Sequence, residues 1–236
     1  MLKLVVLPGA FGMRNISPFC LKMEMLLTAL DVPFEMVEEA DPRKAPKGKL
    51  PYLIDGDEVI ADSELMVHHV DKLTQGRVFE GHSAEEHAIG LSATRLAEEH
   101  LYWGIVASRW LDEAWWPNVV EGFFHIAPKP VRGLVAGLAR RQVRKTYDLQ
   151  GLGRHSPEEQ RGFFRRDLDA LQALVSSKPF LLGDTPTVHD FAVAGILAGL
   201  FDNQPATWIT RLAEPYTELK AYADRVQETV GVWGRK

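Results

Sequence analysis

The stretch MLKLVVLPGAFGMRNISPFCLKMEMLLTALDVPFEMV, residues 1–37, carries the hydrophobic patterns that decide the fold. Leu2–Leu7 is a continuous apolar run, which is typical of a buried strand. Ser17-Pro18 then supplies the N-cap and first-turn proline of a helix in which apolar residues recur every three or four positions. Phe34–Val37 is a second short strand. The order strand, helix, strand predicts a parallel pair of strands joined by a right-handed crossover.

The next segments complete a small α/β domain over residues 1–75. Tyr52–Ile54 and Val59–Ala61 flank an Asp-Gly-Asp turn, which predicts a β-hairpin. Ser63–Leu73 has the apolar spacing of a helix. Residues 76–83 are polar and contain glycine, and they therefore predict a linker.

Beyond the linker almost every apolar segment has helical period, which predicts an all-α domain over residues 84–236. Residues 115–132 are interrupted by three prolines. Capping boxes are expected at Ser156/Glu159 and, with Asp in place of Glu, at Thr187/Asp190. The helix after the second box is apolar nearly all round and should form the buried centre of the domain. The expected helices cover Ser83–Arg109, Leu134–Leu149, Pro157–Val175, Phe191–Phe201 and Pro215–Thr229.

Composition narrows the possible functions of the chain. It has 236 residues, of which 46% are hydrophobic and 25% charged, so it is an ordinary globular protein rather than a disordered or membrane protein. A net charge of −5 argues against nucleic acid as a partner. The single cysteine, Cys20, excludes an intrachain disulfide and favours a cytoplasmic location. No histidine or cysteine spacing is typical of a metal site, and no apolar run is long enough to predict a membrane partner.

Three short segments lie where a domain of this kind keeps its chemistry. SPFC (17–20) opens the first helix, Leu50-Pro51 precedes the third strand, and Asp62-Ser63 opens the last helix. A parallel β-α-β unit with a hairpin and a helix describes a thioredoxin-like domain. Followed by an all-α domain, it resembles the glutathione S-transferase superfamily.

Longer motifs are similar to one branch of that superfamily, the failed-axon-connections and metaxin branch. They occur in both halves of the chain, whereas residues 110–150 match least clearly. The motifs are SPFCLKMEMLL (17–27), APKGKLPYLI (45–54), DSELMVHHV (62–70), GLGRHSPEE (151–159) and KPFLLGDTPTVHDF (178–191).

The resemblance implies a glutathione site. The residue before a cis-proline, here Leu50 before Pro51, would offer its backbone to the cysteinyl part of glutathione, with Lys49 beside it. Asp62 and Ser63 would hold the γ-glutamyl end, where a helix N-terminus favours a carboxylate. The alternatives are a trans proline at Pro51 and simple N-capping by Asp62 or Ser63.

Ser17 is the predicted thiol-activating residue, because it occupies the position of the nucleophilic cysteine in thioredoxin-like redox loops. A thiol of pKa about 8.5 needs roughly 2 kcal/mol to be half ionised at pH 7. A hydrogen bond to a charged group supplies about 1.5–3 kcal/mol, and a helix N-terminus adds about 0.3–1 kcal/mol. The alternative is that Ser17 only caps its helix.

Three neighbours of Ser17 have competing interpretations. Cys20 is a second possible nucleophile, but its apolar surroundings favour a buried structural thiol. Arg14 and Asn15 are candidate contacts to the thiolate or to glutathione, and the alternative for both is a solvated loop.

The helical domain is expected to supply the wall of the electrophile pocket. Tyr102 is the predicted proton donor, since a phenol can assist a leaving or opening oxygen. The other candidate pocket residues are His100, Trp103, Arg109 and Trp110. An aromatic core or a dimer face is the alternative for any one of the tryptophans.

The favoured function is therefore a dimeric glutathione S-transferase that directs glutathione thiolate at a small hydrophobic electrophile, with epoxide opening attractive because of Tyr102. Glutathione is then a co-substrate, and no metal is expected. The alternatives are a non-enzymatic, metaxin-like adaptor and a thiol oxidoreductase based on Cys20.

Overall fold

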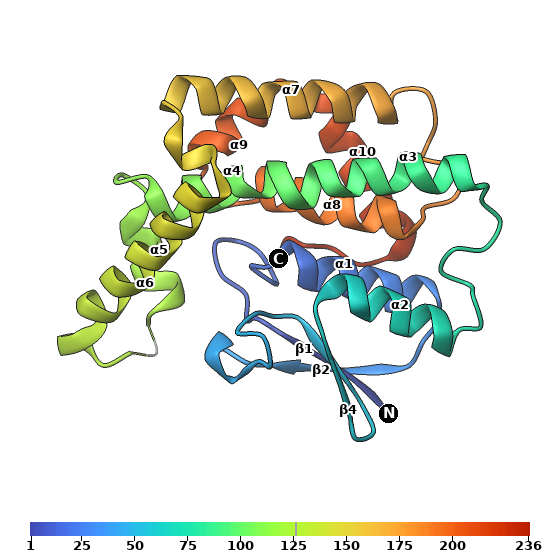
Figure 1. Cartoon of the computed structure of the whole chain (residues 1–236), viewed down its shortest axis with the longest axis horizontal. Coiled ribbons are helices and arrows are strands. Elements are labelled where there is room, and N and C mark those ends of the chain that lie inside the picture. Colours follow the sequence, from blue (N-terminus) through green and yellow to red (C-terminus); the bar gives the residue numbers. More distant parts are fainter. Residues whose placement is uncertain (126) are drawn as a thin grey trace.

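A four-stranded mixed sheet forms one side of the computed structural model, which describes residues 1–125 and 127–236 (Figure 1). The strand order is β2-β1-β3-β4. β1 and β2 are parallel, whereas β3 pairs with both β1 and β4 in the antiparallel direction. The predicted β-α-β unit and hairpin are thereby confirmed. The strands are β1 (Leu2–Val6), β2 (Phe34–Glu38), β3 (Tyr52–Asp55) and β4 (Glu58–Ala61).

Two helices lie between the sheet and the helical half of the chain (Figure 1). They are α1 (Pro18–Ala29) and α2 (Ser63–Leu73). Pro18 stands in the first turn of α1, where its missing N–H costs nothing. Because α1 packs on the sheet and on the helical half together, most of its residues are buried, including two charged ones.

The helical half contains a continuous helical rod from Ala84 to Leu111, as the sequence predicts. Two π-helical segments interrupt it, Leu96–Leu101 and Ala107–Leu111. The remaining bounds are α3 (Ala84–Arg95), α4 (Tyr102–Val106), α5 (Trp116–Phe123), α6 (Lys129–Gln150), α7 (Pro157–Val175), α8 (Val188–Phe201), α9 (Trp208–Ala213) and α10 (Thr217–Val230). Within the described residues, no helix is long and apolar enough to cross a membrane.

The start of α6 differs from the sequence prediction. The prolines at 128 and 130 were expected to delay the helix until Leu134, but α6 begins at Lys129. Pro128 is the N-cap residue, and Pro130 falls in the first turn, where a proline is tolerated. The two prolines therefore begin the helix rather than interrupt it.

The predicted central helix is confirmed, since α8 is buried along nearly its whole length. It packs closely against α1 at Gly195. A Cβ atom at that position would lie 2.7 Å from the carbonyl oxygen of Pro18, so only glycine allows this approach. The contact joins the centre of the helical half to the first turn of α1.

Asp190 holds together three segments around the start of α8. Its Oδ2 accepts hydrogen bonds from the N–H and hydroxyl of Thr187, both at 2.8 Å, which confirms the predicted capping box. Its Oδ1 accepts from the N–H of Leu181 at 2.8 Å and from the hydroxyl of Tyr222 at 2.7 Å. Asp190 and Tyr222 are both fully buried. The carboxylate is therefore a junction as well as a cap.

Asp190→Ala is expected to lower the free energy of unfolding by about 3–5 kcal/mol, because several buried donors lose their partner at once. Glu159→Ala is the matched control. It removes the acid of the exposed capping box at Ser156, where the expected loss is about 0.5–2 kcal/mol. Urea unfolding of both variants measures the difference. Equal losses would show that Asp190 acts as a cap alone.

Candidate active site

Strand register brings the three predicted site segments to one edge of the sheet. Tyr52 at the start of β3 pairs with Val5 near the end of β1 and with Ala61 at the end of β4. Pro51 directly precedes Tyr52, and Asp62 directly follows Ala61. The chain leaving β1 reaches the start of α1 through the loop of residues 7–16. The sheet itself thus gathers the three segments.

The Leu50-Pro51 peptide bond is cis, as the resemblance implies. Leu50 is buried, so its side chain anchors the segment in the core of the sheet domain. Lys49, in contrast, is exposed.

The α2 end of the site has a strained backbone. Asp62 has φ +98°, a value that favours glycine, and such strain is concentrated at functional positions. Its Oδ1 accepts a hydrogen bond from the N–H of Glu64 at 3.0 Å, so Asp62 caps α2. The carboxylate is nevertheless exposed, and Ser63 is half-buried beside it. Capping and ligand binding are thus compatible at Asp62.

Ser17 is the N-cap residue of α1, but its hydroxyl makes no capping hydrogen bond. Its backbone N–H donates instead to Oδ1 of Asn15 at 2.9 Å. The amide of Asn15 also donates to the carbonyl of Leu7 at 2.6 Å, and Asn15 is buried. Asn15 therefore shapes the loop with both ends of its amide, and the Ser17 hydroxyl is not committed to the helix.

Distant residues hold the loop before Ser17 in place. The N–H of Arg14 donates to the carbonyl of Gly234 at 2.7 Å, and the N–H of Lys236 donates to the carbonyl of Gly12 at 3.0 Å. The N–H of Gln204 donates to the carbonyl of Phe11 at 2.8 Å. The Arg14 side chain pairs with Glu24 of α1. Figure 1 shows the C-terminal end beside this loop.

Arg109 is a buried cation that joins the loop to the helical half. Its guanidinium donates to the carbonyl of Ile16 at 3.1 Å, to the carbonyl of Gly199 at 3.3 Å and to Oδ1 of Asn203 at 2.8 Å. Among the described residues, no carboxylate is bonded to it. Burial lowers the pKa of Arg109 to about 10, so it stays charged at neutral pH.

The predicted pocket residues fall into separate groups. Tyr102 packs edge-to-face on Phe19 of α1 with ring centroids 5.1 Å apart, and burial raises the pKa of its phenol. Trp110 joins the aromatic rings of α5 and lies 5.3 Å from that of Phe123. Phe123 in turn contacts Phe11 of the loop. Tyr102 therefore packs directly on α1, whereas Trp110 is connected to the loop through Phe123.

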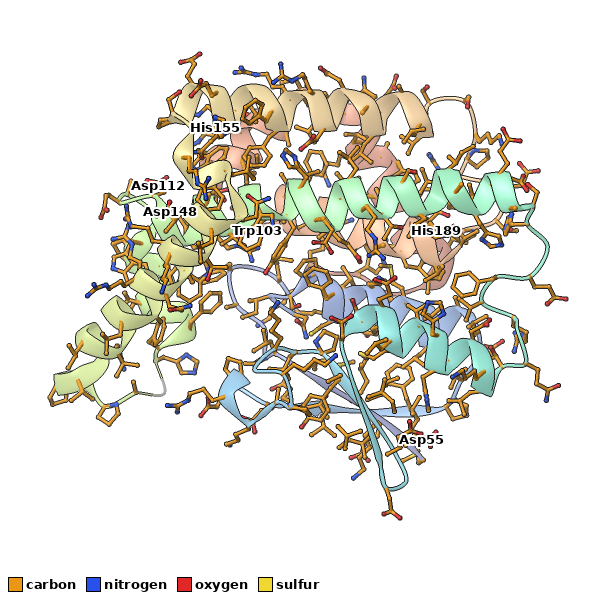
Figure 2. The ribbon with its side chains drawn as sticks, in the orientation of Figure 1. Asp55, Trp103, Asp112, Asp148, His155 and His189 are labelled. Carbon is orange, nitrogen blue, oxygen red and sulfur yellow. The ribbon has the colours of Figure 1, made fainter. Side chains whose placement is uncertain are left out.

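His100 and Trp103 contact other elements. Nδ1 of His100 lies 2.5 Å from Oδ2 of Asp167 on α7. Trp103, labelled in Figure 2, lies with its ring centroid 6.1 Å from that of Tyr147 on α6. Residues two apart on a helix differ by about 200° in direction, which explains why His100 and Tyr102 diverge. The structure does not bring His100 into the group around Ser17.

Two family models match the chain. One, described as the glutathione S-transferase N-terminal domain, covers residues 18–115. The other, the glutathione S-transferase C-terminal domain, covers residues 154–225. Together they span most of the sequence. The chain belongs to the glutathione S-transferase family.

Two curated proteins are similar to this chain, one of them over nearly its full length. The isoprene-epoxide glutathione S-transferase of Rhodococcus sp. (strain AD45) is 32% identical over 229 residues, 93% of this chain and 94% of the relative. The Failed axon connections protein of Drosophila melanogaster is 28% identical over 79% of this chain, which spans only 47% of that longer protein.

Solved glutathione S-transferase structures share the fold at low sequence identity. The Methylobacterium radiotolerans enzyme, in complex with glutathione sulfonate, has a TM-score of 0.63 at 15% identity and covers 100% of this chain and 96% of its own. Human glutathione S-transferase T1-1 in its apo form has a TM-score of 0.61, also at 15% identity. The match covers 98% of this chain and 84% of the human chain.

Some buried residues near this glutathione S-transferase site are not predicted by any single sequence motif. Asn203, which bonds Arg109, is buried just before Gln204-Pro205, a second cis peptide bond. Lys22 and Glu98 form a buried pair at 2.7 Å that links α1 to the helical rod. A charged residue within the apolar pattern of α1 was the available hint of Lys22. Among the described residues, no cluster of three possible metal ligands is found.

Cys20 is buried next to Ser17, as the structural interpretation predicts. Burial raises the pKa of its thiol to about 12, against the smaller opposing effect of hydrogen bonds from Leu7, Ser17 and Asn15. A thiol with this pKa holds its proton throughout the physiological range, which disfavours a nucleophilic role.

Native protein is therefore expected to react with iodoacetamide at pH 8 about a thousandfold more slowly than a free thiol of pKa near 8.5, because so little thiolate is present. Mass spectrometry of the intact chain follows the reaction. Urea-unfolded protein is the control and should react at the ordinary rate. Fast alkylation of the folded chain would restore the oxidoreductase hypothesis.

Proposed function

We propose that this chain is a glutathione-conjugating enzyme whose second substrate is a small hydrophobic epoxide. The observation that carries the proposal is the Ser17 hydroxyl, which makes no capping hydrogen bond at the first turn of α1 and lies next to a loop fixed by the buried cation Arg109. The similarity to a relative named for isoprene epoxide supports the choice of electrophile.

Glutathione would lie along the edge of the sheet described above. The backbone of Leu50 would hold its cysteinyl portion, with Lys49 at the exposed side of the same segment. Ser63 and the exposed carboxylate of Asp62 would hold the γ-glutamyl end, whose carboxylate suits the free N–H groups at the start of α2. This arrangement directs the cysteinyl sulfur toward Ser17.

The thiolate would be stabilised by two groups of this chain. The Ser17 hydroxyl donates a hydrogen bond to it, worth about 1.5–3 kcal/mol. Arg109 donates to the carbonyl of Ile16, the residue directly before Ser17. Its charge has no carboxylate partner among the described residues, so a bound anion would compensate a buried cation. Arg14 is already paired with Glu24 and contributes less.

Tyr102 would act as the general acid in epoxide opening. The thiolate sulfur forms a bond to an epoxide carbon, the carbon–oxygen bond breaks, and the oxygen takes the phenolic proton. Water then returns a proton to the phenolate. Burial raises the pKa of Tyr102, so the phenol carries its proton at neutral pH. Among the described residues, no hydrogen bond occupies its hydroxyl.

The proposal extends to the oligomeric state of the protein and to its location in the cell. Leu65 of α2 and Leu91 of α3 are 51% and 45% exposed, and Ile89 of α3 is 41% exposed. Aliphatic side chains exposed on adjoining helices favour burial against a second copy, so a homodimer is proposed. The reduced, buried Cys20 suits the cytoplasm.

Ser17→Ala is expected to raise the pKa of enzyme-bound glutathione by one to two units, given about 1.5–3 kcal/mol for the lost hydrogen bond and 1.36 kcal/mol per unit. Conjugation near neutral pH should then fall about ten- to a hundredfold and partly recover in alkali. Glutathione affinity should stay nearly constant, because Leu50 and Ser63 hold the tripeptide elsewhere.

Ultraviolet titration of the bound thiolate and calorimetric glutathione binding separate the two effects. An unshifted titration in a folded Ser17→Ala protein would move the activating role to Arg109 or to backbone N–H groups. Strong glutathione binding without conjugation of any epoxide would favour the adaptor hypothesis, which the similarity to the Drosophila protein keeps in view.

Tyr102→Phe is expected to reduce kcat for an epoxide about a hundredfold, since positioned proton transfer contributes about 10²–10⁴. The same variant should conjugate 1-chloro-2,4-dinitrobenzene at an almost unchanged rate, because chloride leaves without a proton. Steady-state kinetics with both substrates make each the control for the other. Equal losses with both substrates would show that the Tyr102 hydroxyl does not act as the acid in epoxide opening.

A further inference from the structure

The motif GLGRH (151–155) forms one wall of a cavity that the proposed reaction does not use. This cavity, the α6–α7 cavity, has a volume of about 500 Å³ and opens where α6 turns into α7. In Figure 2, His155 lies at the start of α7 beside the end of α6 that carries Asp148. The other walls come from α7 and from His100. It shares no lining residue with the glutathione site.

Two glycines fix the backbone of this turn. Gly151 has φ +115°. At Gly153 a Cβ atom would overlap Oδ1 of Asp148 and lie 2.9 Å from its backbone nitrogen, so a side chain there would displace the turn. Gln160 of α7 anchors the far end by donating to the carbonyl of His155 at 2.7 Å. The turn therefore presents the residues beside the glycines in a set conformation.

The charges that line the α6–α7 cavity are mostly positive. Asp167 is the one carboxylate among the described lining residues, and it is already bonded to His100. That hydrogen bond raises the pKa of His100 and holds its ring by Nδ1. Arg154 and Arg166 carry two positive charges, in a chain whose net charge is −5.

The two guanidinium groups keep hydrogen-bond donors available for a ligand. Nε of Arg154 donates to the carbonyl of Asp148 at 3.1 Å, which leaves its terminal nitrogens for another acceptor. Arg166 stacks over the ring of Phe163, 5.1 Å from its centroid. In the part of the chain that the structure describes, neither is paired with a carboxylate. Guanidinium groups of this kind suit a carboxylate or a phosphate.

We propose that the α6–α7 cavity is a second ligand site, separate from the glutathione site, for a small organic anion. A carboxylate or phosphate group of the ligand binds Arg154 and Arg166, and its apolar body packs against Phe163 and Leu152. His100, held by Asp167 through Nδ1, adds a hydrogen-bond donor from Nε2 in its protonated form. The volume admits a molecule with one aromatic ring, and the open mouth permits exchange with solvent.

Phenyl phosphate, benzoate and the uncharged benzyl alcohol test the proposal when titrated into the full chain by calorimetry. At least one of the two anions should bind saturably in the millimolar range or tighter, and benzyl alcohol at least about tenfold more weakly. The stronger of the two anions identifies the head group. Failure of both anions to bind, or equal binding of benzyl alcohol, would overturn the proposal.

Variants locate the bound anion. Arg154→Gln and Arg166→Gln should each weaken binding about tenfold. Arg165 is the exposed residue next to Arg166 on α7 and lies outside the cavity, so Arg165→Gln should leave binding unchanged. Equal weakening by all three would show general attraction of an anion to a basic surface and would refute a site.

Two further readouts separate this site from the active site. The proton NMR signal of His100 should shift with the bound anion, while that of the exposed His125 should not. Saturating glutathione should not change the dissociation constant of the anion, and Arg154→Gln should conjugate glutathione at the parental rate. Competition by glutathione would place the anion in the active site and refute the proposal.

Discussion

A buried positive charge without a carboxylate partner among the described residues is the constraint on which the arrangement of the site depends. The Arg109 guanidinium lies where the loop before α1, the end of α8 and Asn203 meet, and it bonds carbonyl oxygens from two of these segments. Removing a charge from water is expensive unless it is compensated. The carbonyl dipoles fix the loop, and the remaining positive potential suits an anion near Ser17. Arg109 thus both fixes the loop and supplies the positive potential of the proposed site.

The sheet contributes the other half of the site by register alone. Because β3 pairs with β1 and β4 on either side, the chain before β3 and the chain after β4 emerge together. The loop after β1 joins them at the same edge. Each segment then offers a different group: a backbone at Leu50, a carboxylate at Asp62 and a hydroxyl at Ser17. In the proposed complex, the backbone amides, the charged end and the thiol of glutathione would be complementary to this set.

Local patterns predicted the secondary-structure elements and the three segments that meet at the sheet edge, but they did not predict the long-range contacts. The capping box at Thr187/Asp190 and the Ser17-Pro18 helix start depend on neighbouring residues, so the sequence reveals them. The bond from Arg109 to Asn203 joins positions that share no periodicity. His100 was grouped with Tyr102 because they are close in sequence, but the helix turns them toward different neighbours. The sequence also does not distinguish a residue that only caps a helix from one that caps it and binds a ligand as well.

The backbone pairing between residues 234–236 and the loop at residues 12–14 has a consequence for domain exchange. The thioredoxin-like half holds its loop only in part, through Asn15 and Arg14, since Arg109, Asn203 and this distal segment all lie outside it. Transplanting that half onto another helical domain would carry over Ser17 and its bonds to Asn15, but not the contacts from Arg109 and the C-terminal segment. Exchange of one half alone would therefore require the new helical domain to supply equivalent partners for this loop.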